Sequence, residues 1–217
     1  MAHVILDGLE KPVANIFCIG RNYAAHAAEL GNAVESEPMV FLKPTSALLR
    51  EGEDIVLPGF SEDVHHETEL VVLIGKGGDD IPVAEALSHV AGYGIGLDLT
   101  ARDVQSLAKQ KGAPWTKCKG FRHAACVSAL VAADKVRDPQ ALSLRLDVNG
   151  AVRQQGSSCM MLFPVAYIIH YLSCVYGLQE GDLIYTGTPE GVAALHAGDA
   201  LQLSLDGLLK AFWRVRA

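Results

Sequence analysis

The sequence predicts a β-rich α+β fold with few helices. Short strand-like runs recur along the 217 residues, turn dipeptides separate them, and helical patterns fill fewer of the gaps. Strands and helices do not alternate regularly, which disfavours a doubly wound parallel sheet. No internal repeat, charged block or linker divides the chain. We therefore expect one domain over residues 1–217.

The predicted elements follow the chain in this order. Strands are predicted over residues 16–19, 40–42, 54–57, 67–74, 93–99, 142–148, 182–186 and 201–205. Helices are predicted over residues 23–30, 83–89, 101–111 and 161–175. The apolar stretch around the last helix resembles a membrane span, but Pro164, His170 and Ser173 interrupt it and no basic flank marks an end. A buried core helix is the better interpretation.

Two tight hairpins are expected in the second half of the chain. Asn149-Gly150 lies between SLRLDV and AVRQQ, and Asp206-Gly207 lies between LQLSL and LLKAFWRV. Both dipeptides suit a type I′ turn, whose central residues need positive φ. The second half is therefore predicted to be an antiparallel sheet system with one long buried helix.

Composition and charge restrict the partners of this protein. Half of the residues are hydrophobic, and 25 Asp+Glu against 18 Lys+Arg give a formal charge of −7. This excess of negative charge does not suit a nucleic-acid or anionic-membrane surface, so a small-molecule partner is expected. The five cysteines are scattered without a C-x-x-C pair, which argues against a disulfide framework or zinc knuckle. The N-terminal segment contains acids where a secretory signal would be apolar, so we expect a cytoplasmic location.

Three acidic residues lie on predicted strands. Glu67 and Glu69 share one face of a strand whose two faces are both apolar, so burying them costs several kcal/mol unless a cation or protons compensate. Asp98, in GYGIGLDLT, shares its face with Gly94 and Gly96. Those glycines leave space for a ligand or for another backbone to come close.

If the three acids converge, they form an all-oxygen site with open positions. Such a site suits Mg²⁺ or Mn²⁺ better than zinc. His65 has the same strand parity as Glu67 and Glu69, so a zinc or iron site is an alternative. A second alternative has no metal: the two glutamates would mark a solvated strand end, and Asp98 would cap the helix that begins near Ala101.

A histidine and a glutamate occur together near the N-terminus. His26 and Glu29 are three residues apart on a predicted helix, which Asn22 can cap and Gly31 can end. A carboxylate beside an imidazole raises its basicity and fixes its tautomer, as a general base near neutral pH requires. The alternative is a simple surface interaction.

Basic residues follow the third acid. Lys117 and Lys119 in PWTKCKGF are interleaved with aromatic and small residues, unlike a solvated charge run. One of them could face the metal site and stabilise negative charge developing on a substrate oxygen. The alternative is a pair of exposed loop lysines.

Taken together, these segments resemble the fumarylacetoacetate hydrolase family, in its small acylpyruvate hydrolase branch. The resemblance extends over nearly the whole chain in order: IGRNYAAHAAELGN, PMVFLKPTSAL, VHHETELVVLIGK, GYGIGLDLTARDVQ, PWTKCKGF, VNGAVRQQG and IYTGTPEGV. It implies a β-rich roll of mixed sheets that is commonly assembled as a homodimer. The chain departs from the family pattern after Gly191-Val192, where it continues Ala193-Ala194-Leu195 and relatives usually have another glycine.

The resemblance also implies roles for individual residues. Those implied to hold Mg²⁺ or Mn²⁺ are Glu67, Glu69 and Asp98. Those implied in catalysis are His26 and Glu29, a water-activating dyad on a short lid helix over about residues 22–31, and Lys119. Those implied to contact substrate are Arg21, Gln105 and Thr188.

The activity implied by the resemblance is metal-dependent hydrolysis of acylpyruvates such as fumarylpyruvate or acetylpyruvate. The metal would hold the pyruvate enolate, and His26, oriented by Glu29, would deprotonate the attacking water, giving pyruvate and a carboxylic acid. Lys119 would help to bear the negative charge. The same site could instead decarboxylate oxaloacetate or interconvert its keto and enol forms. A non-catalytic metal-binding relative is a third possibility, although such a protein should have lost part of the dyad or of the metal site.

Overall fold

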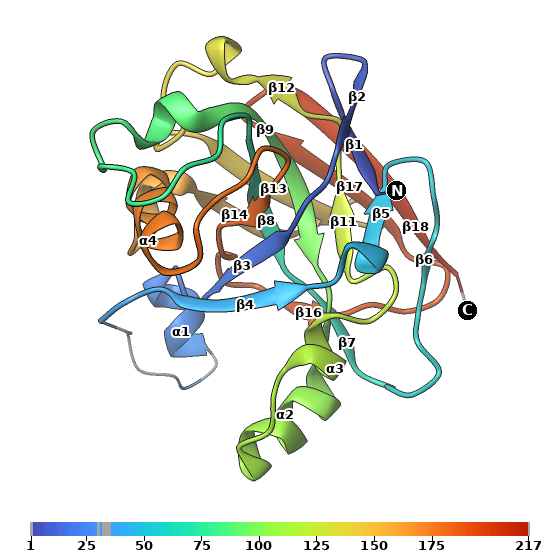
Figure 1. The fold of residues 1–217 in the computed structure, drawn as a ribbon. Coiled ribbons are helices and arrows are strands. Elements are labelled where there is room, and N and C mark those ends of the chain that lie inside the picture. The colour runs from blue at the N-terminus through green and yellow to red at the C-terminus, as the bar shows by residue number, and fades with distance from the viewer. Residues whose placement is uncertain (1, 30, 32–35, 217) are drawn as a thin grey trace.

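The largest sheet is curled and mixes parallel with antiparallel neighbours. The computed structural model describes residues 2–29, 31 and 36–216, and within these ranges this sheet has eight strands (Figure 1). Their order is β4-β3-β15-β8-β9-β11-β5, with β12 beside β9. The strands are β3 (Ile16–Gly20), β4 (Met39–Lys43), β5 (Leu48–Arg50), β8 (Thr68–Ile74), β9 (Val90–Asp98), β11 (Ala125–Val127), β12 (Val131–Ala132) and β15 (Leu183–Tyr185). Every residue of β8 is buried, since β15 and β9 pair with its two edges and side chains cover both faces.

A second sheet of five strands contains most of the C-terminal part of the described chain. Its order is β14-β13-β17-β18-β6, antiparallel except where β6 runs parallel to β18. The strands are β6 (Ile55–Val56), β13 (Ser143–Val148), β14 (Ala151–Ser157), β17 (Ala200–Leu205) and β18 (Leu209–Arg216). Burial alternates from residue to residue along β17 and β18, as expected for strands with one covered face. β13 contacts β8 and β17 contacts β9, so the two sheets share the apolar core.

Both predicted hairpins are confirmed. Asn149 and Gly150 join β13 to β14 with φ of 54° and 78°. Asp206 and Gly207 join β17 to β18 with φ of 44° and 72°. Both pairs therefore have the two positive φ angles that a type I′ turn requires.

A third hairpin of the same kind was not predicted. It joins β1 (His3–Leu6) to β2 (Leu9–Pro12) through Asp7 and Gly8, with φ of 46° and 82°. The Asp-Gly signal is as clear as in the other two, but the flanking strands are only four residues long. In such short strands the alternation of apolar and polar residues is too brief to recognise.

The helices lie outside the sheets. In the described residues the α-helices are α1 (Ala24–Glu29), α2 (Arg102–Lys111), α3 (Thr116–Lys119) and α4 (Val165–Tyr176). The 3₁₀ helices of these residues are η1 (Thr45–Ala47), η2 (Ala86–His89), η3 (Ala133–Lys135) and η4 (Ser158–Met160). Helix α2 confirms the prediction over 101–111 and ends at Gly112, which has φ of 61°. In Figure 1, α2 and α3 project from the lower end of the molecule, and α1 and α4 lie at the left.

The helix predicted over residues 83–89 is wrong in type and in length. The structure has turns followed by the 3₁₀ helix η2. The backbone N–H groups of Glu85, Ala86 and Ser88 each donate to the carbonyl oxygen three residues earlier. These bonds join residues three apart, which is the pattern of 3₁₀ turns and not of an α-helix.

The helix predicted over residues 161–175 begins later than expected and is buried on one face only. α4 starts at Val165, because Pro164 disfavours helical backbone at the residue before it. Val175 and Tyr176 are about half exposed, which corrects the expectation of a buried helix.

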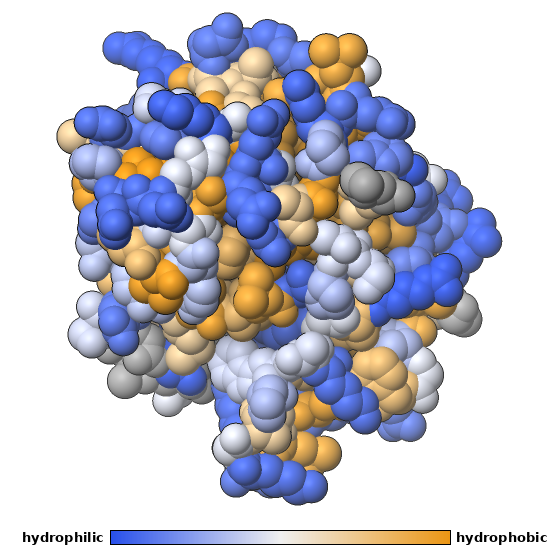
Figure 2. Space-filling model, viewed as in Figure 1, coloured by the Kyte–Doolittle hydropathy of each residue, from blue (hydrophilic) through white to orange (hydrophobic). Residues whose placement is uncertain are grey.

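Among the described residues, no helix combines the length and apolar character that a membrane span requires. On the face shown in Figure 2, hydrophobic residues form separate patches among hydrophilic ones.

A small sheet of three strands borders the acidic segment. Its order is β10-β7-β16, antiparallel throughout. The strands are β7 (Val64–His66), β10 (Thr100–Ala101) and β16 (Ala193–Ala194). The segment in which the chain departs from the family pattern therefore forms an edge strand beside His65 and His66.

The glycines beside Asp98 give close approach to protein atoms. A Cβ atom at Gly96 would collide with the carbonyl oxygen of Cys126, and one at Gly94 would crowd Ser128 and Leu130. Of the two expectations for this face, approach of another backbone is the one that the structure shows. The glycines thus allow β9 and its neighbours to pack tightly beneath the acidic residues.

Candidate metal and substrate site

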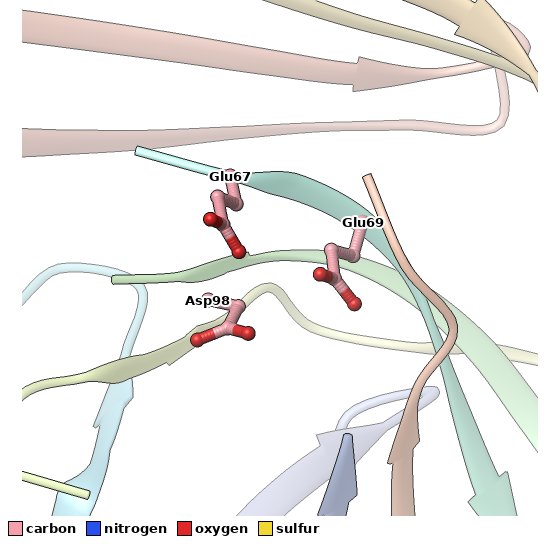
Figure 3. A group of neighbouring side chains, drawn as sticks. All are labelled: Glu67, Glu69 and Asp98. Carbon is pink, nitrogen blue, oxygen red and sulfur yellow. The ribbon is translucent and has the colours of Figure 1, made fainter. Parts of the chain in front are cut away.

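The three predicted acids converge. One carboxylate oxygen from each of Glu67, Glu69 and Asp98 lies within 4.8 Å of the others, and all three residues are buried (Figure 3). The antiparallel register of β8 and β9 produces this arrangement, because the Asp98 N–H donates to the Glu67 carbonyl oxygen at 2.9 Å. The acids therefore do not mark a solvated strand end. Three carboxylates with no sulfur or imidazole form a donor set that suits Mg²⁺ or Mn²⁺.

The two alternatives raised by the sequence are corrected by the same geometry. Asp98 does not cap α2, whose N-cap residue is Ala101 and receives no side-chain hydrogen bond. Its carboxylate is instead paired with buried lysines. His65 lies outside the acidic cluster, and its Nε2 atom is 2.9 Å from Asp63. A His-containing zinc or iron site is therefore not formed by these residues.

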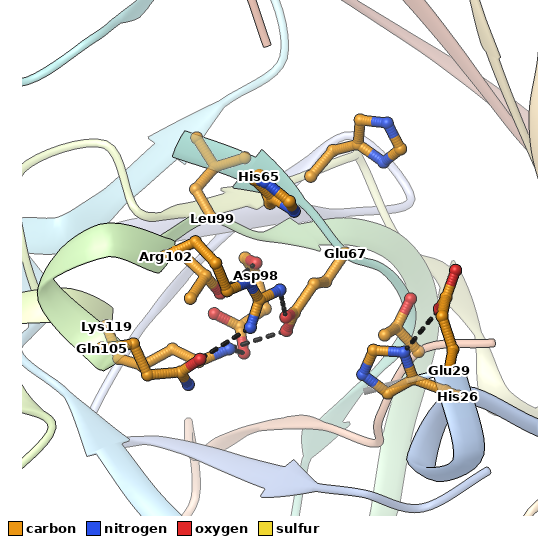
Figure 4. A network of polar contacts seen from close by, with 12 residues as sticks. His26, Glu29, His65, Glu67, Asp98, Leu99, Arg102, Gln105 and Lys119 are labelled. Carbon is orange, nitrogen blue, oxygen red and sulfur yellow. Dashed lines mark hydrogen bonds and ion pairs between the residues drawn. The ribbon is translucent and has the colours of Figure 1, made fainter. Parts of the chain in front are cut away.

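Three cations surround the carboxylates, as Figure 4 shows in part. Lys119 Nζ lies 2.7 Å from both Glu67 Oε2 and Asp98 Oδ2. Arg102 Nη2 lies 2.5 Å from Glu67 Oε1, and Lys43 Nζ lies 2.7 Å from Asp98 Oδ1. The three cations therefore pair with two of the three carboxylates, Glu67 and Asp98, in a buried place where unpaired charge would be costly.

Lys43 and Arg102 were not predicted as site residues. Lys43 ends β4, and its side chain is fully buried. Its ammonium group also donates to the carbonyl oxygen of Leu99 at 3.3 Å and to that of Lys119. The available signal was a single lysine at the end of an apolar run, which a surface lysine would give equally well.

Burial and neighbouring charges shift the pKa values of these groups in opposite directions. Burial alone would raise the pKa of Glu67, but Lys119, Arg102 and His26 outweigh it and hold that pKa well below its usual value. Burial, Asp98 and Glu67 raise the pKa of Glu69 well above the usual range. Burial would lower the pKa of Lys119, yet Asp98 and Glu67 raise it. A divalent cation among these carboxylates would favour the ionised form of Glu69, so metal binding and proton release should be coupled.

The predicted dyad is assembled on α1. His26 Nδ1 lies 3.3 Å from Glu29 Oε2, and the imidazole is buried. A carboxylate can only accept, so Nδ1 carries the proton. The other ring nitrogen lies on the side of Glu67 in Figure 4 and has no hydrogen-bond partner among the described residues. The Glu29 carboxylate also accepts from the Gly191 N–H at 3.1 Å. The pair is therefore more than a surface interaction.

Asn22 does not cap α1 as predicted. Its side-chain amide donates to the carbonyl oxygens of Thr186 at 2.7 Å and Phe163 at 3.1 Å, and it accepts from the Phe163 N–H at 2.7 Å. These long-range bonds satisfy the buried amide better than a local cap would, and they fasten the start of α1 to two distant loops. Of the predicted helix over 23–30, Leu30 lies outside the described residues.

A pocket joins the dyad to the metal site. Its lining residues are Gly20, Arg21, His26, Phe41, Glu67, Arg102, Gln105, Lys109, Trp115 and Lys119. The predicted residues Arg21 and Gln105 thus lie with His26, Glu67 and Lys119 around one space. Four of these ten residues are basic and one is acidic, so the pocket is electropositive.

Two residues that the sequence offered as candidates do not line this pocket. Thr188 is buried outside the pocket lining, where its hydroxyl donates to the Thr68 carbonyl oxygen at 2.8 Å. Lys117 is exposed and lies 5.1 Å from the centre of the Phe60 ring. Of the two lysines in PWTKCKGF, Lys119 is therefore the one that faces the acids.

Comparison with known proteins identifies a family and several relatives of this chain. The family model described as fumarylacetoacetate (FAA) hydrolase C-terminal matches residues 15–216. An oxaloacetate tautomerase of Mus musculus, described as mitochondrial, is 48% identical over 202 residues, which are 93% of this chain and 91% of that protein. An oxaloacetate decarboxylase of Dictyostelium discoideum, also described as mitochondrial, is 44% identical over 89% of each chain.

A solved structure shows the same fold. Fumarylpyruvate hydrolase from Pseudomonas aeruginosa, in complex with Mn²⁺ and pyruvate, superimposes with a TM-score of 0.94 and 39% identity. The superposition covers 99% of this chain and 95% of that one. With the buried acidic site and the β-rich fold already described, these matches show that the chain belongs to the fumarylacetoacetate hydrolase family.

Proposed function

We propose that this protein is a divalent-metal-dependent enzyme that interconverts the keto and enol forms of oxaloacetate, with decarboxylation as the competing reaction of the same site. The observation that carries the proposal is the electropositive pocket beside three buried carboxylates, which suits a small dianion with a 2-oxo group. The similarity to an oxaloacetate tautomerase and an oxaloacetate decarboxylase supports the same substrate.

The residues of the pocket can carry one proton from carbon to oxygen. A divalent metal held by Glu67, Glu69 and Asp98 would supply a Lewis acid for the oxygens of the substrate. His26, with its Nδ1 proton held by Glu29, offers its other ring nitrogen as the base for a C3 proton. Lys119, whose ammonium group contacts both Glu67 and Asp98, would place positive charge beside the oxygen that becomes negative. Keto–enol exchange would break the C3–H bond and form an O–H bond at the 2-oxo oxygen, with His26 returning the same proton to that oxygen, so no carbon–carbon bond is broken and no water is consumed.

Lys109 supports a substrate with a second carboxylate. It lines the pocket one helical turn beyond Gln105, with Nζ 5.6 Å from the centre of the Trp115 ring. In the described part of the chain no carboxylate pairs with it. Partial burial and the nearby Arg21 and Arg102 lower its pKa, so an added negative charge would be stabilised there.

Acylpyruvate hydrolysis is the second candidate, and the dyad favours it. His26 and Glu29 have the geometry of a base that activates water. The similar structure from Pseudomonas aeruginosa is a fumarylpyruvate hydrolase with Mn²⁺ and pyruvate. A non-catalytic relative is disfavoured because the dyad and all three acids are present and assembled.

The test offers three substrates to one enzyme preparation. Oxaloacetate enriched in its enol, acetylpyruvate and fumarylpyruvate are each followed by ultraviolet absorbance with Mg²⁺ and with excess EDTA, while released pyruvate is assayed. The proposal expects metal-dependent loss of enol absorbance without equivalent pyruvate. Pyruvate from oxaloacetate would indicate decarboxylation, and faster metal-dependent cleavage of an acylpyruvate would replace the proposal by hydrolysis.

Several expectations stay predictions. These are the single domain over residues 1–217, the cytoplasmic location, the homodimer, the choice between Mg²⁺ and Mn²⁺, and the roles of the individual pocket residues. A contact of Thr188 with substrate also stays a prediction, and Thr188 could only accept a hydrogen bond in it, because its hydroxyl proton is already donated to Thr68.

A further inference from the structure

Gln154 is a buried amide whose hydrogen-bonding capacity is fully used. It lies on β14 and is 1% exposed. Its Oε1 accepts from the Thr68 N–H at 3.0 Å and contacts His66 Nδ1 at 2.9 Å. Its Nε2 donates to Thr188 Oγ1 at 2.8 Å and to the Pro189 carbonyl oxygen at 2.9 Å. Two acceptor and two donor positions are thus all satisfied.

The orientation of this amide follows from its backbone partners. The Thr68 N–H can only donate, and the Pro189 carbonyl can only accept. Reversing the amide would place donor against donor and acceptor against acceptor. Gln154 Oε1 must therefore face Thr68, and His66 must carry its proton on Nδ1 to donate to the same oxygen.

A β-bulge places Gln154 on the buried face. Pairing between β13 and β14 shifts by one residue, so that Asp147 is opposite Val152 but Leu146 is opposite Gln154. Continued regular pairing would put Arg153 opposite the buried Leu146 and would turn Gln154 to the other face. The extra residue therefore directs the amide inward, toward the site.

The partners of Gln154 belong to both halves of the site. Thr68 lies between the metal-site residues Glu67 and Glu69 in sequence. Thr188 and Pro189 begin the loop whose Gly191 N–H binds the Glu29 carboxylate. One side chain thus connects the strand that carries the acids to the loop that holds the dyad.

We propose that Gln154 is a positioning residue that fixes the segment Glu67–Glu69 and the loop 188–191 relative to each other. The proposal rests on the metal site of the proposed function but on neither candidate reaction. Side chains that orient ligand-bearing segments without touching the metal typically change metal affinity by about 10- to 100-fold when removed. Gln154 meets that description through backbone bonds to the strand and to the loop.

The test compares Gln154→Met with Gln155→Met. The neighbouring Gln155 is exposed on the same strand, so it is a matched control for the change in composition and strand propensity. Binding of Mn²⁺ is measured by calorimetry on the full chain, alongside thermal unfolding. We expect the Mn²⁺ Kd to rise about 10- to 100-fold in Gln154→Met and less than about twofold in Gln155→Met.

A milder variant and a measurement on the unmodified protein keep the proposal open to refutation. Gln154→Asn keeps the amide but is one methylene too short to reach both segments, so its Mn²⁺ Kd should also rise. In the unmodified protein, nitrogen NMR should find the His66 proton on Nδ1. Unchanged Mn²⁺ affinity in a folded Gln154 variant, or a His66 proton on Nε2, would overturn the proposal.

Failure of the proposed reaction would be seen separately. An enzyme that binds Mn²⁺ in a Gln154-dependent way but does not act on oxaloacetate would remove the tautomerase proposal and leave this inference intact. An enzyme that acts on oxaloacetate but has the same Mn²⁺ affinity in all variants would support the proposed function and remove the positioning role of Gln154.

Discussion

The metal site and the dyad are held in place by different means. Each carboxylate of the metal site lies on or next to a buried strand of the large sheet, and each has a charged or backbone partner within 2.7 Å. The dyad lies on α1, a helix of six residues. Its Glu29 side chain is one-third exposed and is tied to the rest of the fold by the Gly191 N–H.

Because the two regions are held differently, substitutions in them should have different effects on folding and on catalysis. A site built into paired strands is preorganised, but its charges are buried and must remain balanced. A helix of six residues is not stable alone, so its position depends on a few tertiary contacts. Changes in the metal site should therefore affect metal binding and folding together, whereas changes in the dyad should affect proton transfer far more than metal binding.

The largest effect is expected from Asp98→Asn. The change removes a metal ligand and leaves Lys43 and Lys119 without their shared anion, which costs about 3–5 kcal/mol when one partner of a buried pair is lost. Calorimetry should find no Mn²⁺ binding, and urea denaturation should show the lost stability. Asp134→Asn, at an exposed position, is the control. Normal Mn²⁺ binding by Asp98→Asn would remove this residue from the metal site.

His26→Ala should separate the two regions most clearly. The loss of the base should reduce turnover by about 10²- to 10⁴-fold, the usual contribution of general acid–base catalysis. Mn²⁺ affinity should stay close to that of the unmodified protein, because His26 is outside the acidic cluster, whereas truncation of the buried imidazole should lower thermal stability. His196→Ala, at an exposed histidine, controls for the change in composition. Turnover that is unchanged in His26→Ala would exclude the dyad from the mechanism.

Metal affinity should rise with pH because of Glu69. Burial, Asp98 and Glu67 raise its pKa, so the folded metal-free protein keeps a proton that the unfolded chain releases above the usual value of 4.5. The unfolding free energy of the metal-free protein should therefore fall as pH rises from that value toward the raised pKa. Bound Mn²⁺ should displace the proton and so remove this fall in the unfolding free energy.

Calorimetry in buffers with different ionisation enthalpies measures the proton released on Mn²⁺ binding. Glu69→Gln should bind Mn²⁺ more weakly and release fewer protons. Binding without proton release in the unmodified protein would show that Glu69 is already ionised.

The smallest effect is expected from Lys109→Met, which changes the pocket between the two regions. Losing one partly exposed charged contact should raise the KM for oxaloacetate by roughly five- to tenfold, with little change in kcat. Mn²⁺ affinity should not change. Lys111→Met is the control, because Lys111 is an exposed lysine of the same helix that does not line the pocket. An equal KM in both variants would contradict a second carboxylate contact at Lys109.

Features that depend on neighbouring residues were predictable from the sequence. The hairpin at Asn149-Gly150 and the pairing of His26 with Glu29 are local features. The structure has the positive φ angles of the turn and the side-chain contact of the pair. The convergence of Glu67 with Asp98 needed only the pairing of two strands. Local backbone preferences and periodicity are sufficient for such features.

The counterions and the fastening contacts were not predictable in the same way. Lys43 reaches Asp98 across 55 positions of sequence, and Asn22 binds Phe163 and Thr186 more than 140 positions away. A lysine or asparagine has the same local signature whether it is exposed or buried. Only packing shows which of them loses its water and must find a partner.

The sequence by itself determined the β-rich class, the hairpin turns and the residue types that can hold a hard metal ion and move a proton. The tertiary structure decided which residues complete that site. The bulge opposite Leu146 shows the reason, since a shift of one residue in strand register exchanges Arg153 for Gln154 on the buried face. Register depends on the summed packing of whole sheets, and that sum is absent from any local stretch of sequence.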